Sequence, residues 1–461
     1  MKKIAALSAM LALVCTVTAC SSGRESSITM NEAQYADDGK PIITVGSFGF
    51  FDSAFSDYLA FPQDYHIKNV NYMNGDTTYE QAAWNLDLDV IQGNSPDIIF
   101  APPEKMYNYI RKGALTDLYS LMDDIDGLKR EDFLPNVLEG LTIDGELPAV
   151  VDSFNISTAV AKTKFVGEEY TNWTPEQAIQ FYNDLPAGRS FIGDDDYSLP
   201  FYMLRNTGKG CVDYTSFKCN FAGSNFADIL RFCAEHPYIE GYVPDYSTMS
   251  VEEMAELSGG SEPPGYGDSQ LVFPVDIIGI NHALAIYTYG DLNREDVTFV
   301  GLPSNDGNGA KTYVNLHESC PYGIMKSCSN KEDAWKLMCQ LLRYRKKLDE
   351  NLWDDTRGVP VLMSQLDLDF DRSESYHSSI NGVMHPPGES DEDGGGFHIS
   401  QEAKDKLRDY ILSVKIDIYY PDEVSYIIDE ESDPVLAGER TPEQAAKILD
   451  NRITTILSEK A

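Results

Sequence analysis

The chain has 461 residues, of which 42% are hydrophobic and 11% aromatic. This length exceeds what one hydrophobic core usually serves, so we expect two or three domains, or lobes of one domain, and the apolar content excludes a disordered or fibrous chain. The 36 Lys and Arg residues against 74 Asp and Glu residues give a net charge of −38, which disfavours binding to nucleic acid or to anionic lipid through a basic patch. The composition predicts an acidic, soluble, globular protein that suits a neutral or cationic partner.

The first twenty residues have the organisation of a secretory signal. A short basic start precedes an apolar run over residues 4–14, and small residues lead to Cys20. The run is too short to span a bilayer as a mature helix, which favours a signal peptide over residues 1–19. The sequence Val17-Thr18-Ala19-Cys20 resembles the bacterial lipobox, in which the cysteine is lipidated. We therefore predict lipidation of Cys20, a flexible tether over residues 20–40, and a location at the cell surface, on the outer face of the cell membrane. An ordinary cleavable signal with a chance cysteine is the alternative.

Six further cysteines lie in the body of the chain. Their even number in an extracellular protein permits disulfides, but none has C-x-x-C spacing, and a chain of this size does not need covalent staples. We expect most of them to be small buried apolar side chains, and one or two bridges are left open. They are Cys211, Cys219, Cys233, Cys320, Cys328 and Cys339.

Short apolar runs alternate with helical patterns in the first part of the body. Strands are predicted at residues 42–45, 67–72 and 97–100, and helices at 53–59, 78–92 and 106–112. This β-α-β-α-β-α order predicts a parallel sheet covered on both faces, which is an α/β architecture. Ligands of such sheets bind beyond the carboxyl ends of the strands, which here are residues 46–51, 74–75 and 101–104.

The remainder of the chain is less regular. Extended backbone is predicted at 149–151 and 156–161. The apolar run 270–280 is predicted to be an edge strand or to carry a bulge, because Pro274 cannot donate to a ladder. Helices are predicted at 175–182, 225–235, 251–257, 334–344 and 441–458, within a largely helical C-terminal region. Trp84, Trp173 and Trp335 are predicted to lie in the core, whereas Trp353 is undecided.

Acidic or glycine-rich loops are predicted at residues 367–375 and 389–396. The first carries Asp367, Asp369 and Asp371 but lacks the glycine at position six that a calcium loop requires. The seven histidines form no ligand cluster with each other or with cysteines. We therefore predict no metal and no cofactor.

Six segments carry patterns that occur in this order in one protein family. They are Gly93–Phe100 (G-x-x-P-D-I), Gly113–Leu118 (G-x-L-x-D-L), Asp144–Ala149, Trp173–Gln177 (W-T-x-D/E-E), Lys218–Phe232 (K-C-x-F…F…L-x-F) and Asn330–Lys336 (N-K-E-x-A-W). Together they resemble extracellular solute-binding proteins of family 1, the sugar-binding lipoproteins of ABC importers, over nearly the whole mature chain. The segment 144–149 departs from the family pattern, because the usual aromatic residue and the usual proline position differ.

The resemblance implies a two-lobed, type II periplasmic-binding-protein-like fold, in which each lobe is a mixed, mostly parallel sheet flanked by helices. The chain would cross between the lobes near residues 151–154, 315–318 and 361–366. Lobe 1 would comprise residues 41–151 and 319–365, and lobe 2 residues 154–316 and 366–461. A mono- or oligosaccharide would be enclosed between them by hinge closure and delivered, by a monomeric protein, to the permease subunits of an ABC transporter.

A sugar site needs aromatic rings for the C–H faces and carboxylates that accept from the hydroxyls. Candidates of these types follow the first strand, lie at the first hinge, or occupy places that resemble aromatic subsites of the family. For each of them packing, capping or an edge position is the alternative role. The candidates are Phe48, Phe50, Phe51, Glu104, Asp152, Ser153, Phe201, Tyr202, Asp276 and Tyr426.

Enzyme motifs are absent from the sequence, which contains no G-x-S-x-G elbow, no Walker loop, no dinucleotide fingerprint and no H-E-x-x-H. We therefore expect a binding protein without catalytic residues. One alternative is a surface glycan hydrolase, which would require two carboxyl groups about 5–10 Å apart. The other is a sensor or adhesion lipoprotein with a protein partner.

Overall fold

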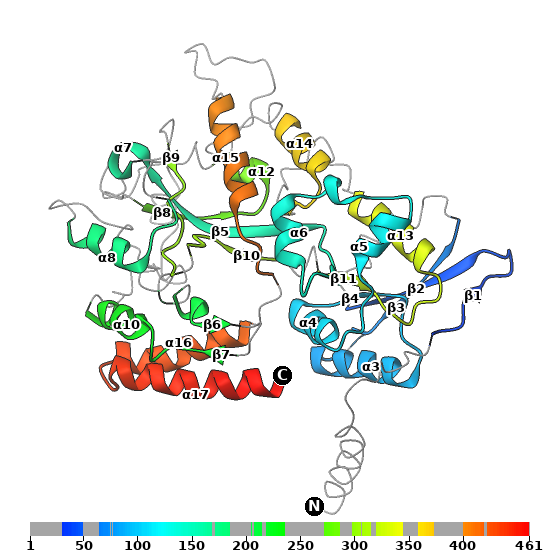
Figure 1. Cartoon of the computed structure of the whole chain (residues 1–461), viewed down its shortest axis with the longest axis horizontal. Helices are drawn as coiled ribbons and strands as arrows, with labels where there is room; N and C mark the ends of the chain where they lie inside the picture. The colour runs from blue at the N-terminus through cyan, green and yellow to red at the C-terminus, as the bar shows by residue number, and fades with distance from the viewer. Residues whose placement is uncertain are drawn as a thin grey trace, which may run out of the picture.

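The computed structural model describes residues 30–48, 64–73, 75, 77–167, 171–184, 204, 207–213, 218–235, 272–285, 297–305, 307–314, 320–343, 358–372, 400–418 and 422–460. Two β-sheets lie side by side in an elongated molecule, each with helices packed on it (Figure 1). The first sheet is mixed, whereas the described strands of the second are all antiparallel, so the prediction of a mostly parallel sheet is wrong for the second. Several predictions fall outside the described residues: Cys20, the helices at 53–59 and 251–257, the crossover at 315–318, the loop at 389–396 and Trp353.

The first sheet contains the three strands that the apolar runs predict. Strands β3 (His66–Asn71) and β4 (Ile98–Phe100) pair in parallel with β2 (Pro41–Ser47). Strand β1 (Gln34–Tyr35) is antiparallel to β2, and β11 (Tyr322–Ile324) is antiparallel to β4. The predicted parallel order is confirmed for the first three strands, and a distant part of the chain makes the sheet mixed.

Helix α3 (Tyr79–Gln92) shows how local sequence sets the ends of an element. Thr78 and Gln81 form a capping box at its start, and Gly93 ends it with a left-handed φ of 77°, a conformation that costs glycine little. Pro103 opens α4 because the first turn of a helix does not need its N–H. The other helices near this sheet are α4 (Pro103–Arg111), α5 (Leu118–Asp124), the 3-10 turn η1 (Arg130–Asp132), α6 (Pro135–Leu141) and α13 (Lys331–Arg343).

The second sheet is built around one long strand, β5 (Ser153–Lys162). Four strands pair with it, all antiparallel: β8 (Val272–Ile277), β9 (Val297–Thr298), β10 (Lys311–Tyr313) and β12 (Val359–Pro360). Pro274 lies opposite Ala159, and within the described residues β8 pairs with β5 alone. The predicted edge position of the proline-containing strand is therefore confirmed.

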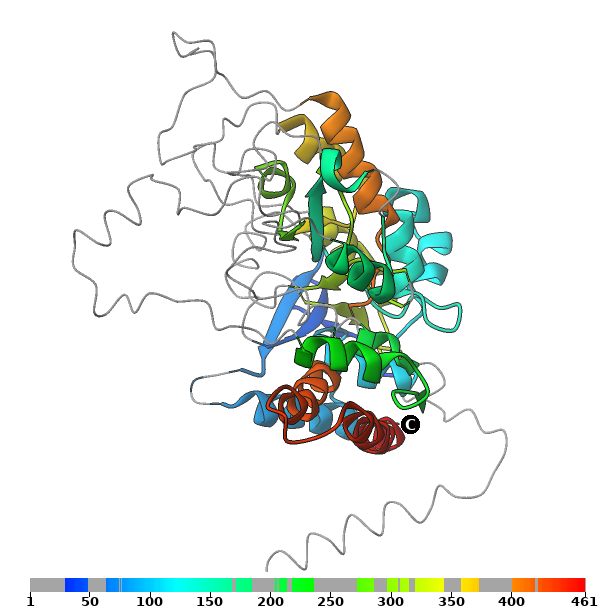
Figure 2. The ribbon, with the colours of Figure 1, turned by 90° about the vertical axis from the view of Figure 1, so that its left-hand side faces the viewer.

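Helices cover this second sheet and form a separate layer beside it. Helices α10, α16 and α17 pack against one another in that layer (Figures 1 and 2). The remaining elements are α7 (Thr163–Val166), α8 (Pro175–Asn183), β6 (Val212–Asp213), β7 (Lys218–Cys219), α10 (Phe226–Glu235), α12 (Ile280–Ala285), α14 (Met363–Arg372), α15 (Gln401–Ser413), α16 (Asp422–Leu436) and α17 (Pro442–Lys460). In the described part of the chain, no helix has the length and apolar character needed to cross a membrane.

Two hydrophobic cores hold the elements together. The larger one joins Ile43 of the first sheet to Val160 of β5, so it continues from one sheet to the other. It also contains Leu407 and Ile411 of α15, a helix that lies in the segment predicted to belong to lobe 2; the lobe boundaries stay a prediction. The smaller core lies under α10, α16 and α17.

The tryptophan predictions are confirmed for Trp173 and Trp335, which are 1% and 0% exposed, and wrong for Trp84, which is 60% exposed. Helix α3 buries Ala82 and Leu86. Trp84 is two residues from each, and at about 100° per residue this places it on the opposite face of the helix.

The predicted acidic loop at residues 367–375 is also wrong, because α14 continues through Arg372. Leu366 and Phe370 are both buried, and their i,i+4 spacing gives the segment one apolar helical face despite its aspartates. Asp367 forms an ion pair with Arg408 of α15, which fixes the polar side of the helix to its neighbour.

The six body cysteines carry free thiols, and all but the half-buried Cys219 are buried. Burial raises the pKa of Cys233 to about 12 and, although Ser224 lowers it, that of Cys211 to about 11. Thiols with such pKa values stay protonated at neutral pH and act as small apolar side chains. This agrees with the packing role predicted for most of them.

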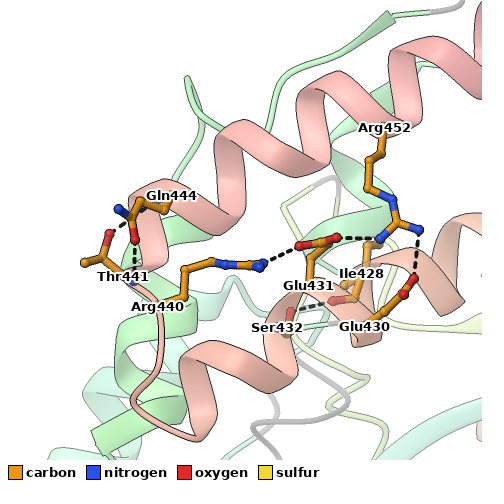
Figure 3. A network of polar contacts seen from close by, with 8 residues as sticks. All are labelled: Ile428, Glu430, Glu431, Ser432, Arg440, Thr441, Gln444 and Arg452. Carbon is orange, nitrogen blue, oxygen red and sulfur yellow. Dashed lines mark hydrogen bonds and ion pairs between the residues drawn. The ribbon is translucent and has the colours of Figure 1, made fainter.

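A network of carboxylates and guanidinium groups joins α16 to α17 (Figure 3). Glu431 accepts hydrogen bonds from Arg440 and Arg452, and Arg452 Nη2 also lies 2.7 Å from Glu430 Oε2. The Glu431 side chain is only 10% exposed. Its burial favours the neutral acid, but the hydrogen bonds from Arg452 and Arg440 outweigh this effect and lower its pKa.

We predict that Glu431→Gln lowers the free energy of unfolding by about 1–3 kcal/mol at pH 7, because two guanidinium groups lose a buried charged acceptor. The lowered pKa means that this stabilisation is present above the ordinary carboxyl range and is lost as the pH falls through the folded-state pKa. Urea unfolding between pH 7 and pH 3 should show the difference between wild type and variant shrinking in acid. The exposed neighbour provides the control, since Glu430→Gln should cost less than about 1 kcal/mol; a pH-independent difference at position 431 would contradict the prediction.

Candidate ligand-binding site

Three side chains gather where the parallel strands of the first sheet end. Phe48 follows β2, Tyr79 opens α3 after β3, and Glu104 lies in the first turn of α4 after β4. The Phe48 ring centroid is 5.7 Å from that of Tyr79. Phe48 is 4% exposed and Tyr79 38%. Phe48 therefore packs behind Tyr79, and Tyr79 presents its ring to the surface at this edge.

Tyr79 is not among the residues that the sequence patterns single out, yet it lies beside the predicted residues Phe48 and Glu104. Burial and the charge of Glu104 raise the pKa of its phenol to about 12. The phenol consequently stays protonated at neutral pH and remains a hydrogen-bond donor. An aromatic residue at the start of the helix that follows a parallel strand is the signal that could have identified it.

The chain passes between the sheets next to this edge. Val150 and Tyr322 form an antiparallel bridge, and β5 starts at Ser153. Asp152 is half-buried and Ser153 is 7% exposed. Burial, with a further contribution from the charge of Asp152, raises the pKa of Tyr322. The two predicted hinge residues thus lie in the first crossover, where a carboxylate influences the buried groups around it.

A polar group continues from the crossover along one face of the second sheet. Asn155 and Ser157 alternate along β5, so they lie on the same face. Tyr313 of β10 is opposite Asn155, and Asp276 of β8 is opposite Ser157. The Ser157 hydroxyl donates a hydrogen bond to Asp276 Oδ1. The structure therefore assigns the predicted Asp276 to a cluster with three polar side chains that sequence reasoning missed.

Tyr313 connects the members of this cluster. Burial and the charge of Asp276 raise the pKa of its phenol, although hydrogen bonds with Asn155 and Ser157 act in the opposite direction. Asp276 itself is exposed. The face thus offers an accessible carboxylate beside a protonated phenol, a carboxamide and a hydroxyl.

The structure gives less information about the other predicted site residues. Tyr426 is 69% exposed on α16, and no contact to either group is recorded for it among the described residues. Phe50, Phe51, Phe201 and Tyr202 lie outside the described residues. Ligand contact stays a prediction for every candidate in the sequence.

The chemistry of the two groups is acceptance and donation of hydrogen bonds beside aromatic rings. Glu104, Asp152 and Asp276 are acceptors, whereas the Tyr79 and Tyr313 phenols can donate. Within the described ranges, no group of three or more His, Cys, Asp or Glu side chains is placed to hold a metal ion. The arrangement suits a neutral ligand that carries both hydroxyl groups and apolar faces.

We predict that Glu104→Gln lowers the pKa of Tyr79 while leaving it above 10, because the variant removes the charge but not the burial. The chain contains 27 tyrosines, so the titration should be followed by NMR of ring-labelled tyrosine, with Tyr79→Phe identifying the signal. Glu139→Gln, on the exposed side of α6, is the matched control and should leave the signal unchanged. An unaltered Tyr79 titration in Glu104→Gln would show that the two side chains do not interact.

Solved structures share this fold at low sequence identity. An extracellular solute-binding protein of family 1 from Alicyclobacillus acidocaldarius is 16% identical with a TM-score of 0.51, and the match covers 92% of this chain and 100% of that one. The sugar-binding protein MalE from Xanthomonas citri is 13% identical with a TM-score of 0.53, covering 91% and 98%. A periplasmic oligogalacturonide-binding protein from Yersinia enterocolitica is 14% identical with a TM-score of 0.52, covering 91% and 99%.

No family model matches the chain, and no curated protein does. The likeness therefore rests on the arrangement of the elements over nearly the whole length of both partners. It confirms the fold that the ordered segments imply. The chain has the two-lobed, type II periplasmic-binding-protein-like fold of extracellular solute-binding proteins of family 1.

Proposed function

We propose that this protein is an extracellular solute-binding protein that captures a carbohydrate between its lobes and delivers it to an ABC importer. The observation that carries the proposal is the pair of groups beside the crossover. Tyr79 and Glu104 come from the first sheet, and Asp276 and Tyr313 from the second. The neighbours in fold are described as solute-, sugar- and oligogalacturonide-binding proteins, which supports the same class of ligand here.

The chemistry of these groups favours a neutral sugar over an ionic solute. A pyranose ring has an apolar C–H face that stacks on an aromatic side chain, and its hydroxyls both donate and accept. Tyr79 supplies a partly exposed ring, and the carboxylates of Glu104 and Asp276 supply exposed acceptors. A net charge of −38 would repel an anionic solute at long range.

Lobe closure links the two groups to transport. A solute held on one side by the first sheet and on the other by the second becomes buried only when the lobes approach. Binding energy then stabilises the closed form, and a transporter that recognises this form is engaged only by the loaded protein. The predicted lipid on Cys20 would hold the domain on the outer face of the cell membrane, near the permease.

We predict that calorimetric titration with glucose, galactose, maltose, cellobiose and xylobiose identifies at least one saturable ligand. Tyr79→Ala and Asp276→Asn should each weaken its binding about tenfold or more, equivalent to about 1.4 kcal/mol. Tyr182→Ala on α8 and Asp228→Asn on α10 change the same residue types at positions remote from the crossover, and they should bind as wild type does.

Two outcomes would count against the proposal. Titrations that show no heat for any of these sugars would remove the evidence for a carbohydrate ligand. Release of shorter saccharides from maltose, cellobiose or xylobiose during incubation, abolished by Glu104→Gln or Asp276→Asn, would instead establish the glycan hydrolase alternative.

We further predict that Cys20→Ala releases the protein from the membrane fraction of expressing bacteria. Lipid chains contribute about 0.8 kcal/mol per buried CH₂, and the acidic surface offers no electrostatic substitute. Immunoblots of membrane and soluble fractions measure the distribution, and Cys15→Ala is the control that should keep the protein in the membrane. Equal membrane retention of both variants would show that Cys20 is not the anchor.

A further inference from the structure

A hollow of about 560 Å³ lies on the first sheet, away from the crossover. Its lining includes Ile42 and Thr44 from the first half of β2 and Lys68 from β3, whereas the candidate ligand-binding site lies where these strands end. The C-terminal end of α3 and the following residues 93–97 close one side. Strand β1 lies at the end of the molecule opposite to the second sheet (Figure 1). The hollow is thus distinct from the candidate ligand-binding site but adjoins it at Tyr72, which lines the hollow and whose ring centroid is 6.2 Å from that of Phe48.

The floor of the hollow is apolar and firmly held. Ile42, Val70 and Pro96 contribute hydrocarbon surface. Tyr72 also lines the hollow and donates a hydrogen bond of 2.8 Å to Asp89 Oδ2 on α3. The Thr44 amide donates to Asp97 Oδ2 at 2.8 Å, which ties the sheet to the loop that forms the wall. These contacts keep the hollow open as a preformed cavity.

An N-terminal strap, residues 31–35, passes along the hollow and is fixed at both ends. The Asn31 backbone N–H donates to the Ser327 carbonyl at 2.8 Å, and its side-chain amide donates to the Ser95 carbonyl at 2.8 Å. At the other end Gln34 pairs with Ile42 and Tyr35 with Pro41. Residues 31–35 lie within the flexible tether predicted over residues 20–40, and that prediction is wrong for this part because this segment pairs with β2 and contacts Ser95 and Ser327.

The rim offers hydrogen-bonding groups of both kinds. Within the described residues, no hydrogen bond or ion pair is recorded for the Lys68 ammonium, and Asp89 Oδ1 accepts none, since only Oδ2 is used by Tyr72. The exposed carboxamide of Asn94 stands beside them in the lining. The carboxylates of Glu32 and Asp97 also line the hollow, so acidic groups outnumber the single Lys68 ammonium there, which disfavours an anionic ligand.

We propose that this hollow is a second binding site, for a small polyhydroxylated molecule of monosaccharide size. The volume falls in the range of small-molecule pockets, and most of the lining side chains are polar, which suits a ligand with many hydroxyl groups. The C–H face of a sugar ring or cyclitol fits the floor of Ile42, Val70 and Pro96. Its hydroxyls can donate to Asp89 and accept from Lys68 and Asn94.

The test uses the full mature chain and four probes: glucose, galactose, mannose and myo-inositol, each up to about 100 mM. Backbone amide signals of residues 31–35 and 93–97 are followed by NMR during the titrations, in a Tyr79→Ala, Asp276→Asn background that impairs the proposed interlobe site. We expect at least one probe to shift these signals saturably. Lys68→Met and Asn94→Ala should each weaken that binding about tenfold.

Matched control substitutions test whether any weakening of binding is specific to Lys68 and Asn94. Lys112→Met and Asn108→Ala replace exposed residues of the same types at and after α4, and they should leave the binding unchanged. Saturable shifts that survive in both Lys68→Met and Asn94→Ala, or no shift of residues 31–35 and 93–97 with any probe, would overturn the proposal. Either result concerns the hollow alone, because these shifts are followed in the Tyr79→Ala, Asp276→Asn background, whereas the interlobe site is identified by the binding that these two substitutions remove from the wild-type chain.

Discussion

The structure depends on the pairing of one strand, β5, which starts at the crossover and accepts all four partner strands of the second sheet. Its alternate residues serve both hydrophobic cores: Ile156 and Val160 belong to the larger one and Ala159 and Ala161 to the smaller. The position of β5 therefore sets the positions of all four partner strands. The polar residues Asn155 and Ser157 occupy the part of β5 nearest the crossover, so a ligand held there would be coupled directly to the hinge.

The function that we propose uses this coupling. Tyr79 supplies an aromatic ring and Glu104 a hydrogen-bond acceptor. Both lie on helices that start at the carboxyl edge of the first sheet, where open α/β sheets bind their ligands. Asp276 and Tyr313 come from a rigid antiparallel ladder on the other side of the crossover. Neither half alone can enclose a sugar. A protein that divides its binding groups between two bodies converts ligand binding into relative movement of those bodies, which is what a transporter can recognise.

Local patterns in the sequence were sufficient to predict the strands and helices whose bounds are set by neighbouring residues. Strands β2 and β4 appear as short apolar runs, and α3 and α8 carry capping boxes that mark their starts. Strand β11 has only three residues, and its place beside β4 depends on a pairing across more than 200 positions that no local pattern reveals. Trp84 was misplaced because an apolar residue near a helical stripe resembles a core residue unless its angle on the helix is counted.

The candidate site likewise contains some residues that the sequence could predict and others that it could not. Asp152, Ser153 and Asp276 could be nominated because a family resemblance or an interrupted apolar run marked them. Tyr79 lies at the start of a predicted helix, where the pattern gives no reason to expect a ligand contact, whereas Phe48, which packs behind it, directly follows a strand. The partnership of Asp276 with Ser157 and Tyr313 follows from the register of β5 with β8 and β10, which only the folded structure supplies.

Small-angle X-ray scattering of the mature chain, with and without a saturating sugar identified by calorimetry, measures the central claim most directly. If the two lobes close around the sugar without reacting with it, the radius of gyration decreases on saturation and the sugar is recovered chemically intact. An unchanged radius of gyration, or a sugar recovered as cleavage products, would contradict the account.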